Sequence, residues 1–252
     1  MSDLIPVGQV PAPVAARVAL ADDAPSLEEL FLFAREAELR VQSLRIHIEE
    51  RAVTARGEDV ITYEIQLRHP GLVRMTTLRD GAALSGDYDI WISDGETVRS
   101  YEAANRVASE RPISRHVAGV TDPGLPRFAQ QREPLTALPP GSLADTFIHP
   151  HGLFRNVLVT GPLAIIGTQE VAGHTCFVVR TEHPRTAKVL VDRPDRSIEI
   201  GIGRDSGFIL FLTERIGEAT TRHAEVTRLD LDPVIFDTAF ELHLPPEARV
   251  LY

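Results

Sequence analysis

A change of hydrophobic period near residue 42 constrains the fold of this chain more than any other feature of its sequence. From Leu44 onward apolar and polar residues alternate, first over 44–49 and again over 61–67. An alternation of period two is typical of strands that bury one face and expose the other. The segment 56–59 between the two runs contains Gly57 among charged residues, which favours a turn. The sequence therefore predicts half-buried antiparallel strands joined by hairpins.

The same pattern recurs in both halves of the chain. In the first half, further strands are expected over 72–79, 88–93, 97–101 and 106–111. In the second half, strands are expected over 163–170, 174–182, 187–192, 197–203, 208–216 and 219–231. Glycine-containing turns separate many of these runs. Because no flexible linker divides the two sets, we expect one continuous sheet within a single domain.

Helical signals are confined to two places. Ser26 is a suitable N-cap with Glu28 and Glu29 in the first turn, and the apolar spacing that follows predicts a helix over 26–40.

The second helical signal begins after Ser142, another N-cap candidate. Two short helices broken by Pro150 are expected within 143–160, lying across the sheet. The proline-rich segment 114–142 before them cannot be one regular element, so we expect it to be a long crossing segment.

The N-terminal segment 1–25 is rich in Pro, Ala and Val without periodicity, which favours an extended arm before a domain spanning 26–252. The chain opens without early Lys or Arg, and its uncharged stretch 4–16 is interrupted by three prolines. Such a stretch is unlike a signal peptide and too short to span a bilayer. We therefore expect a cytoplasmic protein with no transmembrane segment, the alternative being an exported, envelope-associated one.

The charge of the chain bears on its partners. There are 26 Lys and Arg against 36 Asp and Glu, a formal net charge of −10. The electrostatic field of such a chain repels phosphate backbones. The sequence has no run of basic residues interleaved with aromatic ones that would form a local binding patch. We therefore expect no nucleic-acid partner.

The spacing of Gly201, Gly203 and Gly207 is the part of the sequence most similar to a dinucleotide-binding loop. Their spacing differs from the usual pattern, and the segment after them, 208–212, has the composition of a strand instead of a helix. We interpret them as part of a hairpin turn. No cofactor is expected.

The candidate metal ligands and nucleophiles are few. His149 and His151 place two imidazoles close together, but no third ligand with metal-site spacing accompanies them, so we expect no metal site. Cys176 is the single cysteine and lies in an apolar run, where it is expected to be a small buried hydrophobe. Neither a nucleophile elbow nor a phosphate-binding loop occurs. The sequence identifies no catalytic residue and does not favour an enzyme.

Three stretches carry a resemblance to a known family. The run 69–75, His-Pro-Gly-Leu-Val-Arg-Met, is similar to the family's Arg-Pro-Gly-x-aromatic-Arg-Trp strand, and 92–101 is similar to its Ser-Asp-Gly hairpin, in the same order and spacing. The close of the chain, 232–246, resembles the family's C-terminus with its Phe and paired prolines. Together these stretches resemble the LolA/LolB-like superfamily of outer-membrane lipoprotein carrier-like proteins, which includes RseB-like sensors.

This resemblance implies a mostly β, α+β fold, in which a single open, strongly curved antiparallel sheet forms a half-barrel with helices covering its concave side. It also implies non-catalytic binding of an apolar ligand in the concave trough, such as a lipid or a lipoprotein acyl chain, by a carrier or sensor. One alternative is a cytoplasmic biosynthetic enzyme that shapes a hydrophobic intermediate on the same scaffold. Another is an interaction module that binds a protein partner.

The candidate ligand-binding residues are mostly aromatic or apolar side chains expected to face the trough. They are Tyr63, Ile65, Arg74, Trp91, Phe147, Phe154 and Phe211. Arg74 matches the family arginine that ties the sheet to the covering helices, and Met75 stands where the family motif has an aromatic residue.

Overall fold

The computed structural model describes residues 20, 25–55, 57–79, 87–113, 134–150, 152–154, 162–182 and 195–251. The extended arm, the strand expected over 187–192 and most of the crossing segment lie outside the described residues.

A single sheet contains the twelve strands of these residues. Its first-half strands are β1 (Ser43–Thr54), β2 (Gly57–Arg68), β3 (Leu72–Arg79), β4 (Tyr88–Asp94), β5 (Thr97–Glu102) and β6 (Val107–Pro112). Its second-half strands are β7 (Leu163–Val171), β8 (His174–Glu182), β9 (Arg196–Gly203), β10 (Ile209–Ile216), β11 (Ala219–Leu231) and β12 (Arg249–Leu251). Their order is β12-β6-β5-β4-β3-β2-β1-β11-β10-β9-β8-β7.

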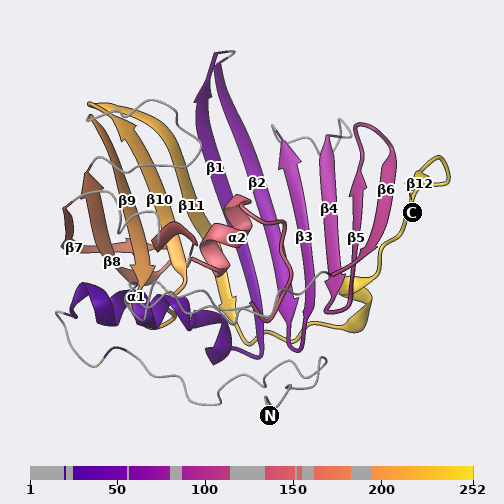
Figure 1. Cartoon of the computed structure of the whole chain (residues 1–252), viewed down its shortest axis with the longest axis horizontal. Coiled ribbons are helices and arrows are strands. Elements are labelled where there is room, and N and C mark those ends of the chain that lie inside the picture. Colours follow the sequence, from indigo (N-terminus) through magenta and orange to yellow (C-terminus); the bar gives the residue numbers. More distant parts are fainter. Residues whose placement is uncertain are drawn as a thin grey trace, which may run out of the picture.

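The sheet joins the two halves of the chain at its centre, where β1 pairs with β2 on one side and with β11 on the other (Figure 1). This confirms the prediction of one continuous, open sheet. The sheet is not strongly curled, so the expectation of a strongly curved half-barrel is met only in its coarser form, a mostly β fold with few helices.

The edge strand β12 corrects the expectation of a purely antiparallel sheet. It pairs with β6 in parallel, Val250 lying opposite Ala108. The sequence pattern missed it because the strand is only 3 residues long and all three residues are exposed, so no alternation marks it. The described sheet is therefore mixed, although largely antiparallel.

The first expected helix is shorter than predicted. α1 (Leu27–Arg35) begins at Ser26, whose side chain accepts from the amide of Glu29 in a capping box. The next turn is a separate 3-10 helix, η1 (Ala37–Arg40), which buries three consecutive residues, 37–39. 3-10 turns are frequent at the C-termini of α-helices, and the hydrophobic pattern of the sequence does not distinguish the two geometries.

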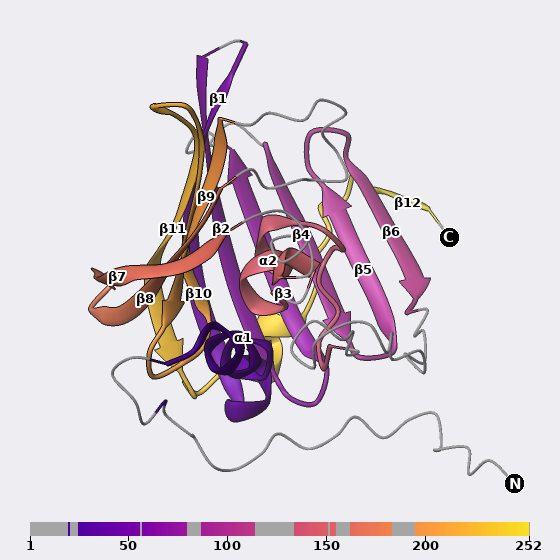
Figure 2. The same ribbon diagram turned by 60° about the vertical axis from the view of Figure 1, so that its left-hand side comes forward.

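The other labelled helices are α2 (Leu143–Ile148) and η4 (Asp237–Phe240). Residues 152–154, after Pro150, are helical as well. Figures 1 and 2 show α1 and α2 on the same face of the sheet. α1 packs against β9 and α2 against β10, whereas η4 packs against β3 and β4.

The helix-covered face, called here the inner face, carries the main core. Ile46 of β1 lies opposite Ile65 of β2 and Leu229 of β11, and this apolar row has counterparts on either side of it. The buried apolar side chains of the inner face include Leu44, Ile46, Ile48, Ile65, Leu67, Val73, Met75, Leu212, Val226 and Leu229. The other face, the outer face, carries a smaller cluster of Ile92, Ile235 and Phe240.

Gly71, in the motif that suggested the family, holds a backbone conformation that only glycine adopts freely. Its φ is +78°, and a Cβ there would lie 2.8 Å from the Cα of Gly95. Gly141 has a similar φ of +70° with nothing within 4 Å of a built Cβ. We expect Gly141→Ala to cost about 1–2 kcal/mol of unfolding free energy, and Gly71→Ala about 1–3 kcal/mol more because of the clash. Urea denaturation of both variants measures the difference, and equal costs would contradict the close approach.

Candidate ligand-binding site

The short helix α2 supplies the apolar layer over the inner face. Ser142 caps it by accepting from the amide of Asp145 at 3.1 Å, and four of its six residues are buried. An isolated helix of this length is not stable in water, so α2 depends on the sheet beneath it. Phe147 contributes the largest buried side chain of this helix, with an exposed fraction of 0%.

A stacked aromatic pair joins the two covering helical regions. The rings of Phe31 in α1 and Phe154, which follows α2, have centroids 4.4 Å apart and planes 9° apart. Both side chains are fully buried. The pair therefore ties α1 to the region of α2 in the same apolar layer.

A buried polar cluster fixes this layer in place. The carboxylate of Glu38 in η1 accepts from the amides of Leu135 and Thr136, both at 2.9 Å, and from the hydroxyl of Thr136 at 2.6 Å. His149, at the end of α2, places Nε2 3.4 Å from the same carboxylate and Nδ1 2.8 Å from Asp145. We call Glu38, Thr136, Asp145 and His149 the Glu38 cluster. It connects η1, the segment before α2, and α2 itself.

The Glu38 cluster holds opposite charges out of water. Burial disfavours the charged form of His149, but the charge of Glu38 and hydrogen bonds to Asp145 and Glu38 outweigh it and raise the pKa of His149 from 6.5 to about 9. Burial likewise opposes ionisation of Glu38, but His149, Thr136 and His69 outweigh it and lower its pKa from 4.5 to about 2. The pair is therefore ionised over the neutral pH range.

The stability that this pair provides is expected to depend on pH. For His149 the folded pKa of about 9 exceeds the unfolded value of 6.5, so its contribution is complete below pH 6.5 and is lost as the pH rises through 9. For Glu38 the contribution is complete above pH 4.5 and is lost as the pH falls toward 2. Chemical denaturation should show an alkaline loss of about 3 kcal/mol that His149→Gln abolishes. If the variant showed the same loss, another group would be responsible.

The Glu38 cluster places a hydroxyl, an imidazole and a carboxylate in contact with one another, as enzymes with a nucleophilic side chain do. Thr136 Oγ1 lies 3.3 Å from His149 Nε2. That hydroxyl already donates to Glu38, and Thr136 is only 3% exposed. A nucleophile must reach its substrate, so the arrangement is suited to holding segments together.

Five of the seven candidate residues expected from the sequence come together around the inner face. Ile65 and Phe147 are fully buried there, and Phe154 stacks on α1. The Tyr63 hydroxyl donates to Glu50 at 2.7 Å, and the Trp91 indole donates to the carbonyl of Ala137 at 2.8 Å.

The other two candidates, Arg74 and Phe211, lie on the outer face. Arg74 donates to the carbonyls of Ala239 in η4 at 3.4 Å and of Glu241 at 3.0 Å, so it ties the sheet to the C-terminal segment and not to α1 or α2. The ring of Phe211 fills the space of a side chain at Gly201, where a Cβ would lie 2.3 Å from it. Side chains alternate between the two faces of a strand, and each of these residues is next to an inward-facing one. Both side chains therefore point to the outer face. Gly201 thus serves packing.

The charged residues of the site were missed by sequence reasoning. Glu38, and Glu50 with Arg222, whose Nε donates to the Glu50 carboxylate, have no motif around them. Each acquires its role through partners distant in the chain. Only His149 had been singled out, as a metal-ligand candidate. No group of three or more His, Cys, Asp or Glu among the described residues is arranged to hold a metal ion.

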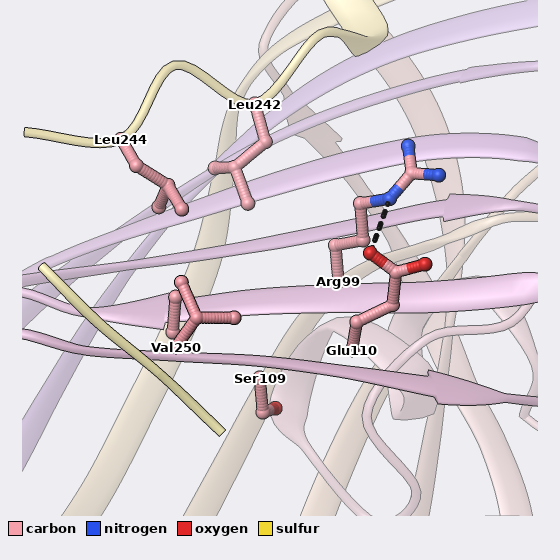
Figure 3. Close-up of a pocket in the computed structure, with 7 residues that line it drawn as sticks. Arg99, Ser109, Glu110, Leu242, Leu244 and Val250 are labelled. Atoms are coloured by element: carbon pink, nitrogen blue, oxygen red, sulfur yellow. Dashed lines mark hydrogen bonds and ion pairs between the residues drawn. The ribbon is translucent and has the colours of Figure 1, made fainter. Parts of the chain in front are cut away.

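A separate pocket of about 320 Å³ lies at the edge of the outer face (Figure 3). Leu242, Leu244 and Val250 form its apolar walls, while Arg99 and Glu110, 3.2 Å apart, form an ion pair beside them. Both charged groups are thus already paired.

Among the described helices, none is long and apolar enough to cross a membrane.

Comparisons with known proteins give relatives at the level of structure. No protein-family model and no curated protein matches the chain. An uncharacterized conserved protein from Thermus thermophilus has a TM-score of 0.51 at 9% identity, covering 90% of this chain and 99% of that chain. MucB from Pseudomonas aeruginosa, in complex with MucA, has a TM-score of 0.49 at 15% identity, covering 86% of this chain but only 60% of that chain. A LolA superfamily protein from Nitrosomonas europaea has a TM-score of 0.33 at 9% identity, covering 87% and 99%.

The structural neighbours include the family that the sequence motifs suggested. At 9% identity, the likeness to the Thermus thermophilus protein concerns the fold alone and does not extend to a ligand. The structural neighbours of this chain are thus LolA superfamily proteins, MucB, the lipoprotein LppX and lipoprotein-sorting proteins, all at low identity.

Proposed function

We propose that this protein binds an apolar chain, such as a lipid or an acyl group, between its inner face and the covering helices, as a carrier or sensor. The observation that carries the proposal is the construction of the cover. α2 has only 6 residues, its buried side chains meet an apolar sheet face, and the Glu38 cluster anchors its end.

The physical basis is that an apolar chain can replace apolar side chains. When α2 lifts, the inner face exposes a large apolar surface, which costs about 25 cal/mol per Å² in water. A bound chain covers that surface again, so the lifted state is favoured only with the ligand present. The inner face would then act as the trough, with α1 and α2 as its movable cover.

The only tryptophan of the chain is placed to report such a movement. Trp91 lies on the inner face and its indole bonds to Ala137, in the segment that leads into α2. Titration with a fatty acid should change the Trp91 fluorescence emission saturably, because uptake would alter this environment. Native mass spectrometry of the same samples should show the added mass.

A charged residue in the apolar layer should prevent uptake. Phe147→Asp places a carboxylate among fully buried side chains, whereas Phe236→Asp, at a residue that is 72% exposed, is the matched control. We expect uptake to be lost in the first variant and retained in the second, with circular dichroism checking that both fold. A wild-type protein that shows neither added mass nor an emission change with fatty acids would refute the proposal.

A further inference from the structure

The inner face is apolar at one end and charged at the other. Along β1, Leu44, Ile46 and Ile48 are fully buried and face inward, and the next residue to face inward is Glu50. Glu50 is also buried, although it carries a carboxylate. This end of β1 leads toward the β1–β2 hairpin, away from α1 (Figure 1).

Side chains from the two strands that flank β1, β2 and β11, bind the carboxylate of Glu50. Its Oε1 accepts from Nε of Arg222 at 2.5 Å, and its Oε2 accepts from the hydroxyl of Tyr63 at 2.7 Å. Arg222 Nη1 also donates to Glu214 at 3.4 Å, and Arg196 pairs with Glu214. We call these five residues the Arg222 cluster. Its two arginines and two carboxylates balance in charge.

The guanidinium of Arg222 keeps one nitrogen that its neighbours do not engage. Nε and Nη1 of Arg222 are engaged, whereas its Nη2 has no hydrogen-bond partner within the part of the chain that the structure describes. The Arg222 side chain is 34% exposed, compared with 6% for Glu50, so this nitrogen is accessible. A guanidinium held rigidly by two carboxylates presents its remaining N–H groups in a fixed direction.

The apolar side chains of the inner face lie next to a guanidinium nitrogen that is free to donate. This arrangement is complementary to an amphiphile, which has an apolar chain and a polar head. We infer that the ligand is a single-chain amphiphile whose carboxylate binds Nη2 of Arg222 while its apolar chain lies along the inner face. This inference rests on the proposed function and specifies its ligand. A carboxylate suits the site because hydrogen bonds between guanidinium and carboxylate are short and charge-assisted.

Calorimetric titration with three ligands of equal chain length tests the inference. Dodecanoate should bind roughly 10-fold or more tightly than dodecanol, and dodecylamine should bind no more tightly than the alcohol. Arg222→Gln should remove the preference for dodecanoate over dodecanol. Arg228→Gln, on the outer face of the same strand, is the matched control and should retain the preference.

A second variant keeps the test decisive if Arg222→Gln does not fold. Glu50→Gln removes the carboxylate that competes for Arg222 and preserves an acceptor for Tyr63, so dodecanoate affinity should increase several-fold. Equal binding of the three ligands would overturn the inference and leave the proposed function standing. Tighter binding of dodecylamine, or no gain with Glu50→Gln, would also overturn it. Absence of binding by all three would overturn the proposed function as well.

Discussion

Replacing Glu38 by glutamine is expected to lower the free energy of unfolding by about 3–5 kcal/mol. The amide that replaces one carboxylate oxygen would meet backbone N–H donors, and His149 would lose its buried counter-charge. Removing one member of a buried ion pair costs far more than the pair itself contributes, because the remaining charge stays out of water. Urea denaturation followed by circular dichroism gives the value.

Glu36→Gln is the matched control for this variant. Glu36 lies two residues away, its side chain is 36% exposed, and its ion pair with Arg35 is long at 3.8 Å. We expect a change within about 0.5 kcal/mol. The double variant Glu38→Gln with His149→Gln should lose less than the sum of the two single losses, since the groups are in contact. Strict additivity would show that the pair does not act as a unit.

Truncating either ring of the stacked pair should have a comparable effect. Phe31→Ala and Phe154→Ala each remove a fully buried aromatic side chain, and we expect about 3–5 kcal/mol for each. Phe236→Ala, at a ring that is 72% exposed, should stay within about 0.5 kcal/mol. The same denaturation measurement applies to all three variants.

The double variant of Phe31 and Phe154 tests whether α1 and the α2 region form one cooperative layer. A coupling of about 0.5–1.5 kcal/mol is expected from stacked rings. If the Phe154→Ala loss were far below 1 kcal/mol, the region after α2 would separate from the sheet without unfolding it. That outcome would place the movable part of the cover at α2 alone, and α1 would belong to the rigid scaffold.

Where runs of strand-forming residues are bounded by turns, the sequence predicted the strands well. The expected ranges 72–79, 174–182 and 219–231 coincide with β3, β8 and β11. Ser26 and Ser142 were likewise identified as N-caps, because helix capping depends on residues within one turn. Such local features need no knowledge of distant residues.

The sequence by itself determined the strands, the helix starts and the apolar character of the inner face, because each depends on periodicity and on neighbours within a few residues. Only the tertiary structure decided the parallel edge strand, the assignment of Arg74 and Phe211 to the outer face, and the partners of Glu38 and Arg222. Glu50 and Arg222 are 172 positions apart, and Glu38 and Thr136 are 98 apart. Contacts between such distant residues arise from strand order and register, which a single sequence does not specify.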